Sequence, residues 1–534
     1  MWFADISWRQ FRRSLGGFSA IVCKQEDDVW AEDQYGKTIA QGEAGVDDAQ
    51  VIQSAIDAVE KGIVFLARGT YQCVRDSPAQ IYLKSYVSLV GEGKDATRLI
   101  INRANGVSKG DGISISNTVG ARLISIRVDA KTHDQQAAVV GSNVSDFVAC
   151  DCRFENLDNV FAVYFAGSSS PDVDNEVLDK NNKLINCEIY GEYTGDVLSW
   201  SFQMDSEIAG CKIYGRVALY KGKNVNFHHN FIYDSPNEGI WITGKYYNAH
   251  INNNIIRGTP SYAIRNSGEV YGLVISDNLI YRTGPSGAAT IGLFDYIEGV
   301  VANNYITYTK AAAIGIACNG ILKVVNNIAK NCNRDNKYWY NGGSIFGISG
   351  YKDLFLEFRN NIAYDLNTNG APMTISLGGN EPKAEAIFEG NIFNRSNSFH
   401  GADHPTLGNT ANSELYMIAK NYLAKFKMER NYAFTDSAPE KVLLKTGNEN
   451  SGSKTISGDG VTTDFEIGAH GLVTTDPSKI VVKVSPISSD AIDASPCIGY
   501  VDPSDNTKIR VKFGSPPASG SDNVKITWEA IVIG

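Results

Sequence analysis

The chain carries little charge, and basic charge is the smaller share of it. Only 20% of its 534 residues are charged, and 49 lysines and arginines stand against 59 aspartates and glutamates, which gives a formal net charge of −10. Phosphate binding requires a concentrated basic surface. The composition therefore argues against a nucleic-acid partner.

Long hydrophobic runs are absent as well. No window approaches the roughly 20 apolar residues that a membrane-spanning helix requires. The first residues, MWFADISWRQFRRSL, contain no uninterrupted apolar stretch of the kind found in secretory leaders. We therefore expect no membrane span and no export through an ordinary leader.

The cysteines show no disulfide or metal-binding pattern. There are nine, an odd number, and none forms a Cys-x-x-Cys pair. Cys150, Cys152, Cys187 and Cys211 lie in runs typical of strands. We expect buried free thiols, no metal site and no cofactor, with calcium binding left open.

What the chain does contain suits many short strands. It has 51 glycines and 26 tyrosines, and its 43% hydrophobic content excludes disorder. A chain of this length exceeds what one ordinary core supports, so several domains or a repeat must carry it. Residues 47–62, DDAQVIQSAIDAVEKG, place their apolar side chains on one helical face before strand-like runs, which predicts a short helix capping a solenoid.

A repeated motif, in which a strand ends in Asn and apolar residues follow, is the strongest signal. Its copies are separated by steps of 24, 19, 24, 24, 26, 23, 34 and 30 residues, and steps near 24 suit coils of three short strands. We predict an all-β fold, a right-handed parallel β-helix, in which these Asn side chains stack, tolerate left-handed backbone at a turn and have a structural role. The copies centre on Cys187, Cys211, Asn230, Asn254, Asn278, Asn304, Asn327, Asn361 and Asn391.

A second repeat ends in Gly, in segments such as GIWITG and AIRNSG. Because side chains alternate along a strand, Trp241 and Arg265 are predicted to point outward as neighbours on adjacent coils. The full assignment has Ile240, Ile242, Ile264 and Asn266 inside, and Trp241, Thr243, Arg265 and Ser267 outside.

The C-terminal part has a different pattern. TGNENSGSKT, at 446–455, is typical of a linker, and the later runs KIVVKVSP and KIRVKFGSPP alternate like strands of a small antiparallel β-sandwich. The predicted division is an N-terminal segment (1–45), the β-helix (46–412), a last coil and linker (413–452), and the sandwich (453–534).

The segment DDAQVIQSAIDAVEKGIVFLARGTY, followed by YLKSYVSLVGEGKDATRLI, resembles the opening of pectate-lyase-like β-helix proteins, which include many phage tailspikes. Together with the coils, the resemblance covers roughly residues 40 to 440. It implies a solenoid whose side binds or cleaves a long polysaccharide. The chain lacks the ordered NTD, DD, HG and RIK elements of polygalacturonases and the DPH element of mannuronan epimerases. The resemblance therefore implies neither the polygalacturonase nor the epimerase reaction.

Several charged residues are candidates for the chemistry. Glycoside hydrolysis needs two carboxyl groups about 5 to 9.5 Å apart, a spacing that one or two coil steps provide. A lyase needs a base and a cation that stabilises an enolate-like charge, and Lys221 and Arg265 suit those roles. A solvated surface charge is the alternative for each residue. The candidate carboxylates near the outward ladder are Glu238, Glu269, Asp295 and Glu298, and Asp205 with Glu207 form another pair.

Aromatic residues and histidines are candidates for sugar binding. Trp241, Tyr246 and Tyr247 offer rings that stack on sugars, although packing under a loop or against a neighbouring subunit explains them equally well. His228, and His250 on the next coil, offer hydrogen bonds. A zinc site at His228 and its neighbour is disfavoured, because consecutive strand residues point to opposite faces.

Three functions follow as hypotheses. The first is a homotrimeric viral tailspike or similar appendage, located on the virion tail or outside the cell, that binds and depolymerises a host surface polysaccharide. The second is a secreted polysaccharide lyase or hydrolase, and the third is a non-enzymatic adhesin or filament protein. The trimer is expected because residues 413–445 carry repeated aromatic and aliphatic residues that one chain alone buries poorly.

Overall fold

The structure, a computed structural model, covers the chain from residue 17 to residue 532 with gaps. For residues 364–449 it describes the backbone of the strands only. The residues that it does not describe are 1–16, 75–78, 102–110, 131–136, 157–160, 168–178, 192–194, 285–288, 333–345, 351–353, 365–372, 378–382, 395–405, 410–413, 424–432, 435–441, 446–448, 473–475 and 533–534.

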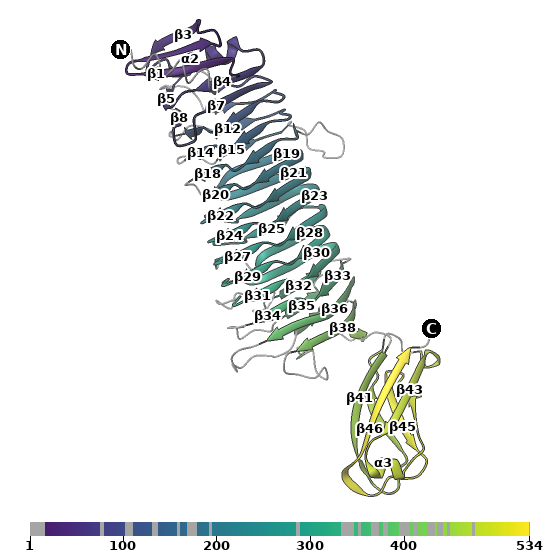
Figure 1. The fold of residues 1–534 in the computed structure, drawn as a ribbon. Helices are drawn as coiled ribbons and strands as arrows, with labels where there is room; N and C mark the ends of the chain where they lie inside the picture. Colours follow the sequence, from purple (N-terminus) through teal and green to yellow (C-terminus); the bar gives the residue numbers. More distant parts are fainter. Residues whose placement is uncertain are drawn as a thin grey trace.

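The chain begins with a capped first coil (Figure 1). Strand β1 (Ala20–Gln25) pairs in parallel with β4 (Gly62–Leu66) and antiparallel with β2 (Asp28–Asp33), which pairs with β3 (Thr38–Glu43). Helix α2 (Asp48–Ala58) contacts these strands through buried apolar side chains and ends where Val59 becomes extended. The large sheet therefore starts at residue 20, earlier than the solenoid limits of 46–412 taken from the sequence.

Helix α2 is tied to the next coils by one buried carboxylate. Asp48 accepts hydrogen bonds from Lys24 Nζ (2.7 Å) and from the backbone N–H of Gln72 (2.6 Å). Its side chain is fully buried, so these bonds replace the water that it loses. The helix is thus fixed on the end of the solenoid, as the sequence predicted.

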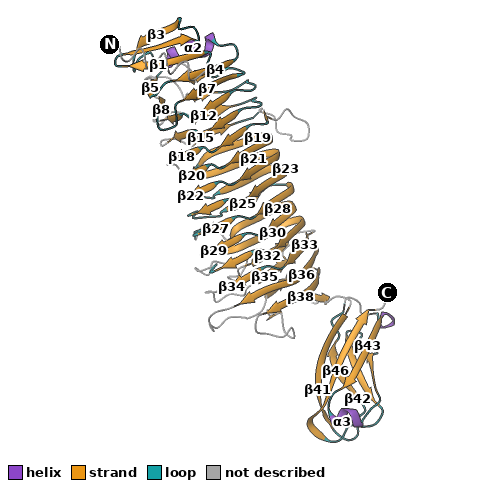
Figure 2. Cartoon of the chain, viewed as in Figure 1, coloured by secondary structure: helices purple, strands orange, loops and turns teal. Residues whose placement is uncertain are grey.

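Successive coils pair in parallel through short strands joined by tight bends, as Figure 2 shows by its predominance of strands. The coils that follow β4 contain β5 (Gly69–Cys73), β6 (Ala79–Tyr82), β7 (Val87–Gly91), β8 (Thr97–Ile101), β9 (Asp111–Ser114), β10 (Arg122–Ile124), β11 (Arg127–Ala130), β12 (Ala137–Gly141), β13 (Val148–Cys150), β14 (Arg153–Asn156), β15 (Phe161–Phe165), β16 (Asp179–Lys180), β17 (Lys183–Ile185) and β18 (Glu188–Gly191). The central coils contain β19 (Asp196–Ala209), β20 (Lys212–Tyr214), β21 (Arg216–His228), β22 (Phe231–Tyr233), β23 (Ile240–Asn252), β24 (Ile255–Arg257), β25 (Ile264–Ser267), β26 (Val270–Ser276), β27 (Leu279–Tyr281), β28 (Ala289–Ala302), β29 (Tyr305–Thr307), β30 (Ala312–Val325) and β31 (Ile328–Lys330).

The large sheet continues beyond residue 412. Its last strands are β32 (Phe346–Gly350), β33 (Leu354–Arg359), β34 (Ile362–Tyr364), β35 (Met373–Leu377), β36 (Lys383–Asn394), β37 (Thr406–Asn409), β38 (Glu414–Leu423), β39 (Ala433–Phe434) and β40 (Val442–Lys445). The side chains of 413–445, on which the trimer expectation rests, lie outside the described residues.

The Asn residues stack along the solenoid as predicted. The side-chain Nδ2 of Asn230 donates to Ile208 O, and Asn254 Oδ1 accepts from the backbone N–H of Asn230. The same pattern continues through Asn278, Asn304, Asn327 and Asn361, all buried. These amides therefore hold the coils together.

Two details of the ladder differ from expectation. The left-handed backbone lies on the residue before each ladder Asn, for example Asn253 (φ 55°) before Asn254. The ladder also starts one coil before Cys187, because Cys152 occupies the same position. The thiols of Cys152, Cys187 and Cys211 donate to Leu123 O, Ala149 O and Leu184 O. Burial raises the pKa of the Cys152 and Cys211 thiols, so they remain protonated.

The outward and inward assignment on the central coils is confirmed. Ile240 pairs with Ile264 and both are buried, whereas Trp241 pairs with Arg265 and both are half-exposed. Inward Ile, Val, Leu and Phe form one continuous core over the coils whose side chains are described, up to Ala363.

The C-terminal part is a separate antiparallel sandwich, as expected. One sheet contains β41 (Glu449–Gly458), β46 (Gly520–Val532) and β43 (Ile480–Pro486), and the other β42 (Asp464–Ala469), β45 (Lys508–Phe513) and β44 (Cys497–Val501). Helix α3 (Ser489–Asp493) packs against β46. The linker assigned to 446–455 is wrong over 449–455, because these residues pair with β46 as part of β41.

No helix within the described ranges is long and apolar enough to span a membrane.

Candidate functional site

Trp241 and Arg265 form the centre of an ordered outward surface. Trp241 Nε1 donates to Ser267 Oγ at 2.6 Å, and the guanidinium of Arg216 lies 4.9 Å from the centre of the indole ring. These contacts come from three successive coils, β21, β23 and β25. The predicted pair of neighbours is therefore present, and the indole is fixed in place while half-exposed.

Glu238 lies between two arginines and is almost buried, with 5% of its surface exposed. Its Oε2 accepts from Arg216 Nη1 at 2.9 Å, and its Oε1 from Arg265 Nη1 at 3.0 Å. Burial alone would raise the pKa of this carboxyl, but the hydrogen bonds from both guanidinium groups outweigh it and the pKa is lowered. Glu238 is therefore ionised, which suits a base or a binding role and not a general acid.

Asp196 joins the same cluster and was missed by the sequence analysis. It pairs in register with Arg216, whose Nε bonds to the Asp196 carboxylate. Burial is the largest influence and raises the pKa of Asp196, and the charge of Glu238 adds to this, while Arg216 opposes it. One arginine therefore connects two carboxyls whose pKa values are displaced in opposite directions.

Arg216 was missed for the same reason as Asp196. Both residues stand at the first position of their strands, and neither lies within a Gly-ended segment of the repeat. The register of β19 and β21 shifts between Asp196 and Leu198, and no sequence pattern marks that shift. We call Asp196, Arg216, Glu238, Trp241 and Arg265 the tryptophan cluster.

The other proposed catalytic residues lie at bends. Lys221 precedes a Gly as Thr243 does, which predicts the same outward face for both. Tyr220 is instead the partner of Thr243, and Lys221 alone stands opposite two residues, Gly244 and Lys245. Its φ of 49° and its contacts with the rings of Phe202 and Tyr220 place it at the bend. The expectation for Lys221 is wrong because this coil is one residue shorter there.

Glu269 and Asp295 are exposed and do not join the cluster. Glu269 follows the bend and accepts a long hydrogen bond from Tyr271 Oη at 3.5 Å. Asp295 has a left-handed backbone with φ 65° and pairs in register with Cys318. Neither makes a described contact with Trp241 or Arg265.

The two candidate tyrosines separate. Tyr246 was predicted to bind substrate, but it is fully buried, because it lies four residues after the inward Ile242 and strand alternation points it into the core as well. Burial raises the pKa of its phenol strongly. Tyr247 does lie on the surface and stacks on Tyr271, with ring centres 5.2 Å apart.

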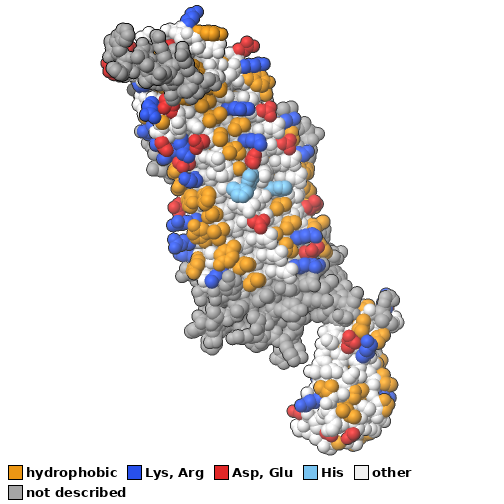
Figure 3. All heavy atoms as spheres, viewed as in Figure 1, with side chains coloured by type: hydrophobic (Ala, Val, Ile, Leu, Met, Phe, Trp, Pro, Cys, Tyr) orange, Lys and Arg blue, Asp and Glu red, His pale blue; other side chains and the backbone are white. Residues whose placement is uncertain are grey.

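His228 lies on another face of the solenoid from Trp241. It pairs with Asn252, and two bends, at Gly244 and Asn248, separate Asn252 from Trp241 along β23. Its Nε2 is 3.0 Å from Glu207 Oε1 and its Nδ1 is 2.8 Å from His229 Nδ1. Both histidines point outward because His229 has a left-handed backbone (φ 56°), so the argument from strict alternation fails here. Figure 3 shows histidines grouped on one face beside an acidic residue.

Asp205 and Glu207 do not form the proposed carboxylate pair. Asp205 lies at a bend with φ 51° and accepts a hydrogen bond from Asn224 Nδ2 at 2.7 Å. Glu207 instead binds Lys183 Nζ at 2.8 Å and His228. Asp205 therefore lies at the bend, whereas Glu207 lies beyond it on the strand in a separate group of charged side chains.

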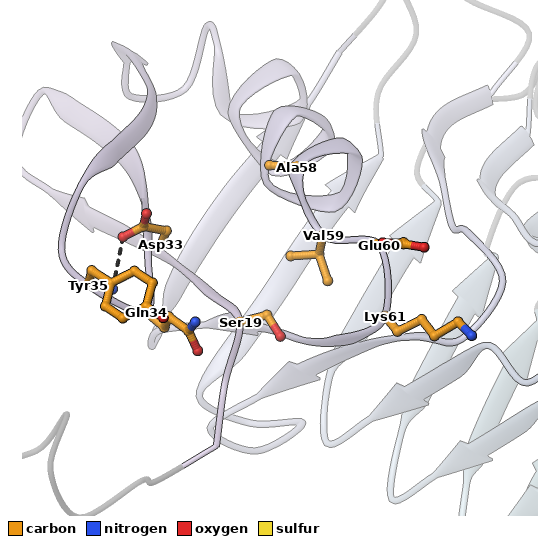
Figure 4. A pocket seen from close by; sticks show the side chains of 8 residues that line it. All are labelled: Ser19, Asp33, Gln34, Tyr35, Ala58, Val59, Glu60 and Lys61. Atoms are coloured by element: carbon orange, nitrogen blue, oxygen red, sulfur yellow. Dashed lines mark hydrogen bonds between the residues drawn. The ribbon is translucent and has the colours of Figure 1, made fainter.

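A cavity of about 420 Å³ lies at the N-terminal end, remote from the tryptophan cluster (Figure 4). It is bordered by the turn after β2 and by the segment that joins α2 to β4, and lined by Ser19, Asp33, Gln34, Tyr35, Ala58, Val59, Glu60 and Lys61. Across the described part of the chain, no three His, Cys, Asp or Glu side chains gather to hold a metal ion.

Comparison with known proteins finds similar solved structures but no similar sequence. No family model and no curated protein sequence matches. The tailspike of E. coli bacteriophage HK620, as a double mutant, is similar with a TM-score of 0.53 and 12% identity over 94% of this chain and 92% of that one. This chain has a parallel β-helix fold like that of the phage tailspike. The tailspike of Pseudomonas phage LKA1 matches with a TM-score of 0.50 and 10% identity over 90% and 92% of the two chains.

A further HK620 tailspike structure, a mutant in complex with a pentasaccharide, matches with a TM-score of 0.51 and 12% identity over 93% of this chain and 92% of that chain. At such low identity the likeness establishes the parallel β-helix and its length. The sites must be argued from the residues of this chain.

Proposed function

We propose that the chain is a spike-like appendage that binds a cell-surface polysaccharide on the outward face containing Trp241. The observation that carries this proposal is the fixed, half-exposed indole between Ser267 and Arg216. A rigid aromatic ring loses little entropy on binding and offers an apolar face to a sugar. The pentasaccharide complex of a protein with the same fold supports the choice of ligand.

The proposal includes cleavage by Asp196 and Glu238. Hydrolysis of a glycosidic bond requires a protonated and an ionised carboxyl group on either side of the bond. The raised pKa of Asp196 suits the acid, and the lowered pKa of Glu238 suits the base or nucleophile. Arg216 binds both carboxyls and so fixes their separation.

A binding-only role is the second candidate, and one observation favours it. Both carboxylate oxygens of Glu238 already accept a hydrogen bond from an arginine, and the residue is nearly buried. A group held in this way supports the surface around Trp241 without meeting a substrate. The experiment below distinguishes the two roles.

Trp241→Ala should weaken polysaccharide binding at least tenfold, since stacking on an aromatic ring is lost. Tyr35→Ala, which removes an 85% exposed ring at the N-terminal turn, should leave binding unchanged. Binding would be measured by surface plasmon resonance on arrays of bacterial capsular and O-antigen polysaccharides. Equal affinities for Trp241→Ala and the wild type would reject this surface.

Asp196→Asn should retain binding and lower the cleavage rate about 100-fold or more, since general acid catalysis typically contributes that much. Reducing ends and the absorbance of unsaturated sugars would separate hydrolysis from lyase chemistry. Asp205→Asn, at an exposed bend, is the matched control. If the wild type releases no fragments from polymers that it binds, the binding-only role is correct.

The proposal also includes a homotrimer attached to a virion. Its support is the tailspike-like fold and a column of half-exposed apolar side chains on the solenoid surface, Phe231, Ile255, Leu279, Tyr305 and Ile328. Attachment to other tail proteins follows from the same reasoning.

A further inference from the structure

Arg265 differs from the other arginine of the tryptophan cluster in how its hydrogen-bonding capacity is used. Arg216 is 15% exposed and binds both Asp196 and Glu238. Arg265 is 36% exposed, and within the described residues its one hydrogen-bonded partner is Glu238. Its Nε is buried without a partner. The buried Nε cannot reach a ligand, so the donors left for one are those of Nη2 and the second N–H of Nη1.

The guanidinium of Arg265 is nevertheless held in position. It lies 5.4 Å from the ring centre of Tyr262 and 5.7 Å from that of Phe294, and the two rings meet edge to face at 5.8 Å. The backbone makes room for this cage at Gly292, where a Cβ would approach Tyr262 to 2.5 Å. Gly292 is the partner of Arg265 in the next coil. Because Gly292 has no side chain, the rings of Tyr262 and Phe294 can lie beside the guanidinium.

A fixed, partly exposed guanidinium with unused donors is a ready partner for a planar anion. Arginine binds carboxylates through two parallel N–H···O bonds, and pre-organisation reduces the entropy lost on binding. The neighbouring indole of Trp241 supplies a stacking surface on the adjacent coil. Together they match a sugar ring that carries a carboxylate.

We infer that the polysaccharide recognised by this surface is acidic, and that Arg265 binds the carboxylate of a uronic or similar sugar while Trp241 stacks on the chain beside it. The inference rests on the proposed polysaccharide binding and specifies its substrate class. Arg216 is excluded from this role because its guanidinium is already bound by two carboxylates. Glu238 then serves to orient Arg265 toward solvent.

The test uses the full-length protein and an array of acidic and neutral bacterial polysaccharides, with each acidic polymer printed beside its carboxyl-reduced form. The wild type should bind acidic polymers about 10- to 100-fold more tightly than the same polymers after reduction, because a charge-assisted hydrogen-bond pair is lost. Arg265→Gln should bind both forms equally, at the level of the reduced polymer. Arg265→Lys should restore only part of the preference, since lysine lacks the planar fork.

Arg257→Gln is the matched control, because Arg257 is a half-buried outward arginine on β24, on a different face. It should keep the full preference, and far-ultraviolet circular dichroism and thermal melting should show that all variants are folded. Binding that depends on Trp241 but is unchanged by carboxyl reduction and by Arg265→Gln would overturn the inference alone. Absence of binding to every polymer would overturn the proposed function, and the inference with it.

Discussion

The amide of Asn254 shows how a single side chain connects three coils. Its Oδ1 accepts from the backbone N–H of Asn230, and its Nδ2 donates to Phe227 O at 3.0 Å and to Asn278 Oδ1 at 3.0 Å. Asn254→Ala would leave a buried N–H and a buried carbonyl without partners, so we expect a loss of about 3 kcal/mol or more in the free energy of unfolding. Denaturant unfolding followed by circular dichroism would measure it.

A comparison with Cys and with an outward residue makes that prediction specific. Asn254→Cys should cost less than Asn254→Ala, because Cys211 already donates to Leu184 O from the same ladder position. Asn252→Ala, at a half-exposed position two residues earlier, should change the stability by less than about 1 kcal/mol. Equal losses at Asn252 and Asn254 would contradict a structural role for the ladder.

Asp179, inside the solenoid, makes a pH-dependent contribution to the free energy of unfolding. It is 2% exposed, its Oδ1 accepts from the N–H of Val144, and its Oδ2 from Gln203 Nε2. Burial outweighs these bonds and raises its pKa from 3.8 to about 6. The folded state therefore holds a proton that the unfolded state releases, so this contribution is present below about pH 4 and is lost as the pH rises to about 6.

Asp179→Asn should remove that dependence. Relative to the wild type, the variant should gain about 3 kcal/mol in the free energy of unfolding between pH 4 and pH 7, the equivalent of a shift of roughly two pKa units. Denaturation midpoints at both pH values, with the exposed-residue variant Glu269→Gln as control, would show it. A difference between variant and wild type that stays constant with pH would mean that the pKa of Asp179 is not raised.

At the scale of single strands, alternation predicts the structure well and bends limit it. Ile240 to Thr243 and their partners on β25 were assigned correctly because each segment is an uninterrupted strand. Tyr246 was misassigned although alternation from Ile240 and Ile242 points it inward, and the left-handed bend at Gly244 does not change that face. Lys221 also occupies a left-handed bend, in a coil that is one residue shorter. Lysine rarely adopts left-handed backbone, so the sequence does not predict a bend there.

The repeat motif was predictable because Asn, or Cys in the earlier coils, recurs at the same position, whereas the candidate site was only partly predictable. Trp241, Arg265 and Glu238 were found near the outward ladder. Asp196 and Arg216 come together through the register of β19 and β21, which the sequence does not reveal where the coil lengths vary. Contacts that depend on register between coils of unequal length therefore require the structure.

On the whole molecule, one column of the solenoid surface changes from charged to apolar. The outward positions of the early coils hold residues such as Arg153, which is ion-paired with Glu155. From β22 onward the successive partners are apolar and half-exposed, and Figure 3 shows hydrophobic side chains gathered along this edge. The column consists of Phe231, Ile255, Leu279, Tyr305 and Ile328. A continuous apolar strip of this kind is a common mark of a protein interface.

If the column forms the contact between subunits, the intact protein should be a homotrimer, with a mass by light scattering of about three times 58.1 kDa. Leu279→Lys should convert it to monomers, because three lysines would meet in an apolar interface, while the outward side chain leaves the coil core intact. Val274→Lys, at a half-exposed position on another face, should remain trimeric. A wild-type monomer at micromolar concentration would remove the trimer from the proposal, and a trimer that survives Leu279→Lys would place the contact elsewhere on the chain.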